Sequence, residues 1–129
     1  MLTTKSVMEA ITNDITTNGI AAKGSVVTPD EGLTIDFAVS DEYLPKCIEK
    51  MHVRLLGRSE EIDDDGERFI RVSAFAAYLD GRDGETHWYH DRYSVYNEVV
   101  GPIKVMNALL WGVGDKSLHD YFNLINRYN

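Results

Sequence analysis

The stretch THWYHDRY, residues 86–93, holds the residue types in this chain that are best suited to chemistry. Two histidines three residues apart would share one face of a helix and there bind a single metal ion. We predict instead that residues 86–99 form a strand, in which successive side chains point to opposite faces. His87 and His90 then face apart, so the sequence predicts neither a metal site nor a bound cofactor.

Strand periodicity divides this segment into two sets of side chains. Either Trp88, His90 and Arg92 or His87, Tyr89 and Asp91 lie on the solvent-exposed face of the sheet, and the sequence leaves the choice open. Arginines offer bidentate donors, and aromatic rings offer flat surfaces for stacking. Such a face suits a protein surface or a nucleotide-like anion. The candidate binding residues are Arg54, Arg58, Arg71, Trp88, His90, Arg92 and Tyr96.

Acidic side chains are concentrated between residues 60 and 67, and this segment contains neither Lys nor Arg. Its acids at alternate positions before Gly66 resemble the start of a calcium-binding loop. The glutamate expected six residues after that glycine is replaced by Val72, so the bidentate ligand is missing. We therefore expect a solvated hairpin tip.

The overall charge limits the classes of partner. Thirteen basic and 21 acidic side chains give a formal charge of −8, which argues against duplex DNA, because phosphates require a basic patch. No apolar run approaches the roughly 20 residues that span a bilayer, so we expect no membrane association. The single cysteine, Cys47, fits a reducing compartment, and we expect a cytoplasmic protein of its own cell or of a host cell.

The remaining periodicities predict the elements that must position these side chains. Val7, Met8, Ile11 and Ile15 recur at helical spacing, and Gly19 is placed to end that helix. Alternation of period two predicts strands elsewhere. We expect a single α+β domain over residues 1–129, with an N-terminal helix, a five-stranded, mostly antiparallel sheet and two C-terminal helices packed on one sheet face. The predicted helices are 3–18, one from residue 103 and one after residue 117; the strands are 20–27, 33–40, 51–58, 69–79 and 86–99; a short helical insertion is expected within 41–50.

Three function hypotheses follow. The first is a small binding or regulatory protein of inhibitor or adaptor type that acts through a protein partner, a type that phages and other mobile elements also encode. The second is a small-molecule binder that sequesters or senses a nucleotide-like anion through the arginine and aromatic face. The third is an enzyme that uses His87 or His90 with a carboxylate for acid/base catalysis. Tyr and Trp on the last strand also favour a homodimer.

Overall fold

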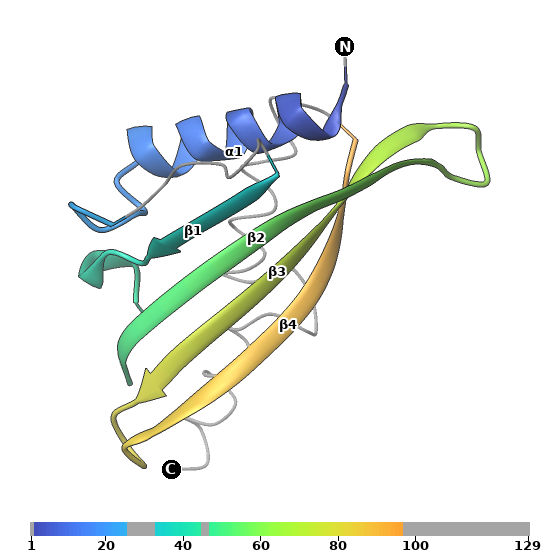
Figure 1. Cartoon of the computed structure of the whole chain (residues 1–129). Coiled ribbons are helices and arrows are strands. Elements are labelled where there is room, and N and C mark those ends of the chain that lie inside the picture. Colours follow the sequence, from blue (N-terminus) through green and yellow to red (C-terminus); the bar gives the residue numbers. More distant parts are fainter. Residues whose placement is uncertain (1, 26–32, 45–46, 97–129) are drawn as a thin grey trace.

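The computed structural model describes residues 2–25, 33–44 and 47–96 of the chain. One helix lies against an antiparallel sheet of long, curved strands (Figure 1). The described elements are therefore of the α+β class that the sequence predicts. In chain order they are helix α1 (Thr4–Thr17), strand β1 (Thr34–Ala38), the 3-10 turn η1 (Asp41–Tyr43), and strands β2 (Ile48–Ile62), β3 (Arg68–Asp80) and β4 (Glu85–Val95).

Helix α1 begins at a capping box. The Thr3 hydroxyl accepts a hydrogen bond from the Ser6 amide at 3.0 Å, and the Ser6 hydroxyl accepts one from the Thr3 amide at 2.9 Å. Gly19 follows the helix with a φ of 68°, the left-handed conformation that glycine adopts most easily. The prediction of this helix and of its end is confirmed.

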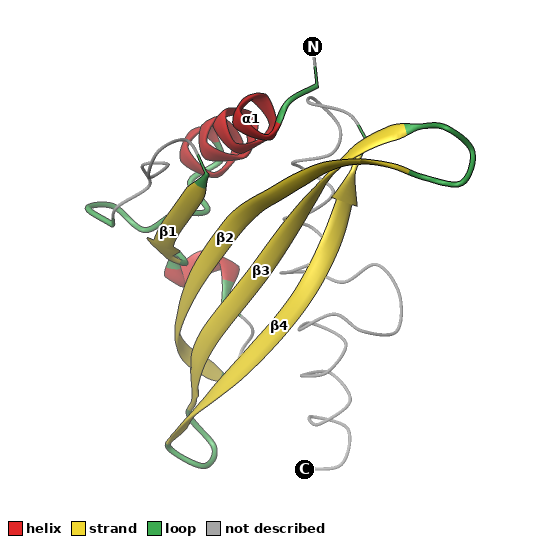
Figure 2. Cartoon of the chain, turned by 45° about the vertical axis from the view of Figure 1, so that its right-hand side comes forward, coloured by secondary structure: helices red, strands yellow, loops and turns green. Residues whose placement is uncertain are grey.

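The four strands form one antiparallel sheet in the order β1-β2-β3-β4. Each strand pairs with its neighbour along the chain, and tight turns join β2 to β3 and β3 to β4 (Figure 2). Both turns lie where the sequence predicts them, at Asp65-Gly66 and within residues 80–85. The β2–β3 hairpin carries the acidic segment and extends past the end of α1 (Figure 1).

The predicted five-stranded sheet is wrong, because the described residues contain four strands. Of the segment expected as a first strand, residues 20–27, the structure describes residues 20–25, and these make only an isolated bridge between Ala21 and Val39. The chain then turns, with a hydrogen bond from the Ser25 amide to the Ala22 carbonyl and a φ of 86° at Gly24. Small residues and glycine leave this segment too little side chain to bury on a sheet face.

In the described part of residues 41–50, which excludes 45 and 46, the expected helical insertion is limited to η1. Leu44 after it has an extended backbone, with φ of −75° and ψ of 138°, which is the conformation that a following proline favours. Strand β2 already begins at Ile48. The two predicted C-terminal helices, and the end of the predicted strand 86–99, lie outside the described residues.

The core lies between α1 and one face of the sheet. Buried side chains alternate with more exposed ones along β1, from Met51 to Leu55 of β2 and in the second half of β3, as expected for a half-buried antiparallel sheet. In the first half of β3, Ser73 on the other face is buried as well. Burial of each large apolar side chain contributes about 1.5–3 kcal/mol to folding. The fully buried large side chains are Met8, Ile11, Ile15, Ile35, Phe37, Leu55 and Ile70.

A β-bulge in β2 changes the direction of its side chains. Gly57 pairs with Val72 and Glu60 pairs with Ile70. Between these two pairs, β2 advances by three residues while β3 advances by two, so β2 contains one extra residue. From Lys50 to Leu56, the even-numbered residues of β2 point away from α1. After the bulge, odd-numbered residues do, and Glu61 joins the same face of the sheet.

Candidate functional site

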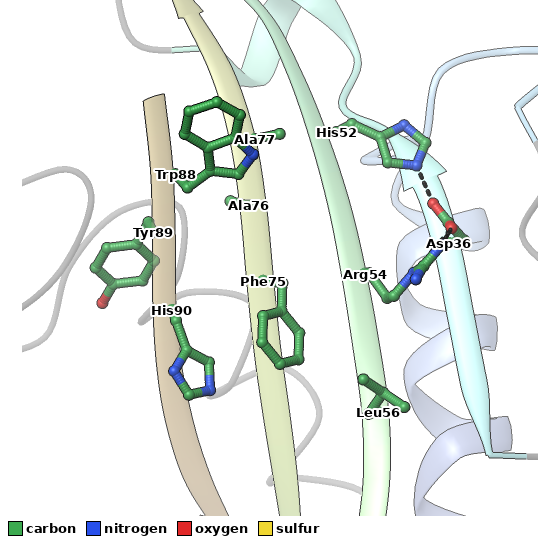
Figure 3. A pocket seen from close by; sticks show the side chains of 10 residues that line it. All are labelled: Asp36, His52, Arg54, Leu56, Phe75, Ala76, Ala77, Trp88, Tyr89 and His90. Atoms are coloured by element: carbon green, nitrogen blue, oxygen red, sulfur yellow. Dashed lines mark hydrogen bonds and ion pairs between the residues drawn. The ribbon is translucent and has the colours of Figure 1, made fainter. Parts of the chain in front are cut away.

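The sheet face that points away from α1 is the candidate site, and we call it the open face. Its side chains come from alternate positions on all four strands, and they surround a hollow of about 500 Å³ (Figure 3). Helix α1 packs on the opposite face, mainly against β2, and leaves these side chains uncovered by the helix. The hollow is lined by Asp36, His52, Arg54, Leu56, Phe75, Ala77, Trp88 and His90. Ala76 and Tyr89 also border it, although their side chains lie on the α1 side of the sheet.

Strand register creates a notch at the centre of this face. Ala77 of β3 pairs with His52 of β2 on one side and with Trp88 of β4 on the other. Neighbouring strands lie about 4.8 Å apart, so two large rings stand roughly 10 Å apart over a single methyl group. The space between them, which we call the Ala77 notch, has the width for one flat side chain or ring. Trp88 forms its outer wall and is 76% exposed.

One end of the notch is closed by stacked rings. Phe75 pairs with His90 across β3 and β4, and their ring centroids lie 4.5 Å apart with an angle of 10° between the planes. This stacking holds the His90 imidazole against the sheet (Figure 3).

The other side of the notch is a polar cluster around Asp36. Arg54 donates from Nε and Nη2 to Asp36 Oδ2, at 3.2 and 2.9 Å. His52 Nε2 contacts the other carboxylate oxygen, Oδ1 (Figure 3). The Arg54 charge is therefore balanced within the protein, and Asp36 fixes the orientation of both side chains.

The comparisons with known proteins give no further guide to this site. No family model, curated protein or solved structure matches the chain. Among the described residues, no helix is long and apolar enough to cross a membrane.

The structure decides which set of β4 side chains joins the arginines. Trp88, His90 and Arg92 lie on the open face, and His87 and Tyr89 lie on the side of α1. The acid/base hypothesis gains no pair from this arrangement. Asp91 lies on the opposite side of β4 from His90. His87 Nε2 lies 2.7 Å from Asp83 Oδ2 in the turn before β4.

Arg58 and Arg92 flank the buried Ser73 of β3, Arg58 through a hydrogen bond and Arg92 through strand pairing. Arg58 donates from Nε to Ser73 Oγ at 3.2 Å, and Ser73 is the cross-strand partner of Arg92. Among the described residues, neither arginine forms an ion pair with a carboxylate. These two guanidinium groups are the part of the open face that is best able to attract an anion.

The two other predicted binding residues are engaged with the acidic hairpin. Arg71 donates to Glu61 Oε2 at 2.7 Å and lies over the Phe69 ring at 5.3 Å. The Tyr96 hydroxyl donates to Asp63 Oδ2 at 2.9 Å, and this bond raises the pKa of Tyr96. Both side chains therefore stabilise the hairpin rather than line the hollow.

Asp63 organises the tip of that hairpin. Its Oδ1 accepts the backbone amides of Asp65 and Glu67 at 3.0 and 2.9 Å. The bond from Glu67 is the main cause that lowers the pKa of Asp63. The carboxylate thus acts as a turn-forming group, in agreement with the expected hairpin tip.

On the α1 side of β4, burial affects two tyrosines. Tyr89 and Tyr93 pack against the core, and the Tyr89 hydroxyl donates to Asp91 Oδ2 at 3.0 Å. Burial is the main cause that raises the pKa of Tyr89 to about 12. It also raises the pKa of Tyr93.

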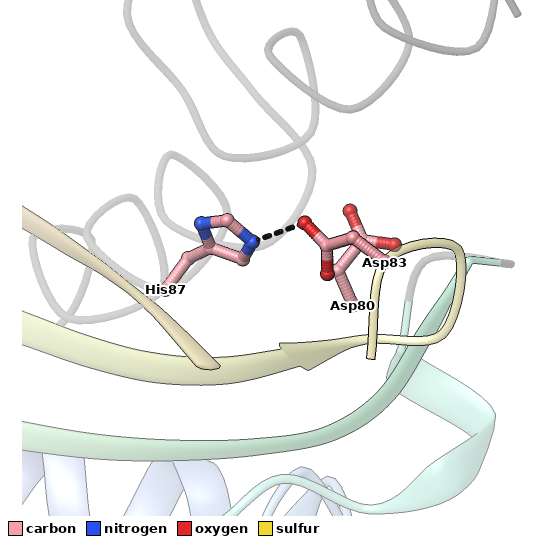
Figure 4. A group of neighbouring side chains, drawn as sticks. All are labelled: Asp80, Asp83 and His87. Carbon is pink, nitrogen blue, oxygen red and sulfur yellow. Dashed lines mark hydrogen bonds and ion pairs between the residues drawn. The ribbon is translucent and has the colours of Figure 1, made fainter. Parts of the chain in front are cut away.

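One polar cluster, at the β3–β4 turn, is not predicted from the sequence. Asp80, Asp83 and His87 place ligand atoms within 4.8 Å of one another (Figure 4). Their spacing in DGRDGETH was the available signal. Asp80 is already bound by Arg82, whose Nη2 lies 2.7 Å from Oδ2, and this hydrogen bond is the main cause that lowers the pKa of Asp80. The Arg82 guanidinium therefore already supplies a positive charge to the Asp80 carboxylate in place of a metal ion. We interpret the cluster as part of the turn structure.

Proposed function

We propose that this chain is a small, non-enzymatic binding protein of inhibitor or adaptor type, and that its open face holds a protein partner. Its expected place is the cytoplasm of its own cell or of a host cell. The single, half-buried cysteine supports a reducing compartment. The observation that carries the proposal is an exposed tryptophan beside a notch of defined width.

Trp88 has the character of an interface anchor. A tryptophan buries a large area when it is covered, and Trp, Tyr and Arg dominate the binding energy of protein interfaces. Here the ring is 76% exposed, yet its strand is held by pairing with β3 along its whole length. A rigid anchor loses little conformational entropy on binding, so more of its contact energy contributes to affinity.

The Ala77 notch indicates what the partner presents. A flat side chain that enters it would contact the Trp88 indole on one side and the His52 imidazole on the other. Aromatic rings and the guanidinium of arginine have this shape. The formal charge of −8 favours a partner whose surface is basic, because opposite charges accelerate association.

The test is capture of partners from the natural source by wild-type protein and by two variants of the notch. Trp88→Ala removes the anchor, and Ala77→Leu fills the notch while it leaves Trp88 in place. Ile62→Ala is the matched control, because Ile62 is an exposed apolar residue of the hairpin and lies outside the hollow. We expect a partner that both notch variants lose and the control retains.

Retention of every partner by both notch variants would contradict the proposal. Loss in Trp88→Ala alone, with full binding by Ala77→Leu, would show that the tryptophan contributes without the notch. Circular dichroism and thermal melting of each variant establish that the sheet is intact.

A nucleotide-like anion is the second candidate ligand, supported by Arg58 and Arg92 at Ser73. Neither guanidinium group pairs with a carboxylate within the part of the chain that the structure describes, and such groups suit a phosphate group. A ligand present at about 100 times its Kd should stabilise the fold by about 2.7 kcal/mol. We expect the corresponding rise in Tm with nucleotides to be lost in Arg58→Ala/Arg92→Ala. Absence of any shift in wild type would eliminate this candidate.

A further inference from the structure

Strand β4 is paired along one edge only among the described residues. It is the last strand in the order β1-β2-β3-β4, and it is 11 residues long. The backbone groups on its outer edge can pair with another strand, which is the usual route of sheet extension between chains.

We propose that this edge pairs with the same edge of a second copy, antiparallel and about a two-fold axis at His90, so that two four-stranded sheets become one of eight strands. The proposal does not depend on the proposed partner at the open face. A two-fold axis perpendicular to the sheet keeps each side chain on its own face, so residues of the open face meet residues of the open face.

This register makes favourable pairs on the open face. Residues opposite each other have numbers that are equally far from 90, so Trp88 lies opposite Arg92 of the second copy, and Thr86 lies opposite Ser94. The first pair places a guanidinium beside an exposed indole, and the second brings two hydroxyls within hydrogen-bonding reach. Both favourable pairs occur twice in the dimer, because the interface is symmetric.

The register also suits the other face of β4. Tyr89 lies opposite Asp91 of the second copy, and these two side chains already form a hydrogen bond within one chain at 3.0 Å. No carboxylate meets a carboxylate. A two-fold axis at Asp91 would instead place two Asp91 side chains opposite each other and Arg92 opposite His90. An axis at Tyr89 would leave Tyr93 opposite Glu85 and residues 94 and 95 unpaired.

Trp88 belongs to both interfaces, because it borders the Ala77 notch and lies on the edge strand β4. Variants that test the dimer are therefore chosen at Arg92 and His90, which leaves the notch residues Ala77 and Trp88 unchanged.

The first measurement is the mass of purified wild-type protein by light scattering over a range of concentrations. We expect twice the 14.6 kDa of one chain at high concentration. Arg92→Glu replaces the guanidinium opposite Trp88 with a carboxylate and should weaken the dimer at least about tenfold. Lys5→Glu is the matched control, since it reverses a charge on the exposed side of α1 and should leave the mass unchanged.

The position of the axis is tested by disulfide formation. Opposed residues of an antiparallel pair have Cβ atoms about 4.5–5.5 Å apart, which a disulfide can bridge with small adjustments. In a Cys47→Ser background, His90→Cys should form a covalent dimer on mild oxidation, whereas Thr86→Cys should not. A monomeric mass at every concentration would overturn the dimer, and cross-linking through Thr86→Cys but not His90→Cys would overturn the register.

Discussion

The imidazole of His90 stacks on the ring of Phe75, with centroids 4.5 Å apart and planes inclined by 10°. The two residues are direct cross-strand partners on β3 and β4. Their contact closes one end of the Ala77 notch. It also fixes the His90 side chain, which lies beside Trp88 on the same face of β4. The shape of the open face therefore depends on a packing contact as well as on the backbone register.

This stacking should be measurable as a coupling energy. In a double-mutant cycle of Phe75→Leu and His90→Ala, we expect about 0.5–1.5 kcal/mol of interaction in the free energy of unfolding, measured in urea. A cycle of Phe75→Leu with Thr86→Ala is the control, because Thr86 pairs with Leu79 and lies farther along the strand. Equal coupling in the two cycles would show that the stacking has no specific energetic effect.

Gly57 should resist substitution because α1 passes directly over it. An added Cβ would lie 2.6 Å from Thr4 Cγ2 and 2.9 Å from Met8 Cγ. Gly57→Ala should lower the free energy of unfolding by about 1–3 kcal/mol, as overpacking does. The loss should be smaller in a Thr4→Ser background, which removes the nearer methyl group. An identical loss in both backgrounds would mean that this contact is not the cause.

The Asp80–Arg82 pair should make stability depend on pH at the acid end. The hydrogen bond from Arg82 holds the pKa of Asp80 below the ordinary value of 3.8. Its contribution is therefore present above pH 3.8 and is lost as the pH falls through the lower pKa of the folded state. We expect Asp80→Asn to be less stable than wild type at neutral pH and the difference to shrink on acidification. Thermal melts from neutral to acid pH measure it, and the exposed Asp64→Asn should change stability by no more than about 0.5 kcal/mol.

Tyr89 should oppose folding at high pH. Burial raises its pKa to about 12 from the ordinary value of 10.0. Its contribution to stability is present below pH 10.0 and is lost as the pH rises toward 12. Wild type should therefore lose stability in this range faster than Tyr89→Phe. Spectroscopic titration of the tyrosines checks the cause. Tyr89→Phe should remove a tyrosine that ionises well above pH 10.0, and removal of one that ionises near pH 10.0 would contradict the prediction.

Local patterns were sufficient for several parts of the fold. Helical spacing located α1, since its apolar residues must form one stripe, and turn residues located both hairpins. Residues 20–25, the described part of the strand predicted over 20–27, were misread because alternation alone does not show whether small side chains have enough area to be buried. The short helix within residues 41–50 was overestimated, since the proline at position 45 disfavours helix at the residue before it.

By itself, the sequence determined that Trp88, His90 and Arg92 share a face and that His87 does not, because side chains alternate in any regular strand. Only the tertiary structure decided which face is open. Both sets of β4 side chains mix aromatic and charged residues, so composition could not show which set is exposed. Tyr89 and Tyr93 pack against the core, and this places Trp88, His90 and Arg92 on the open face. The bulge after Gly57 was also invisible in the pattern, and it brings Glu61 to Arg71. The partners of a strand depend on register, and register is set by contacts between segments distant in the chain.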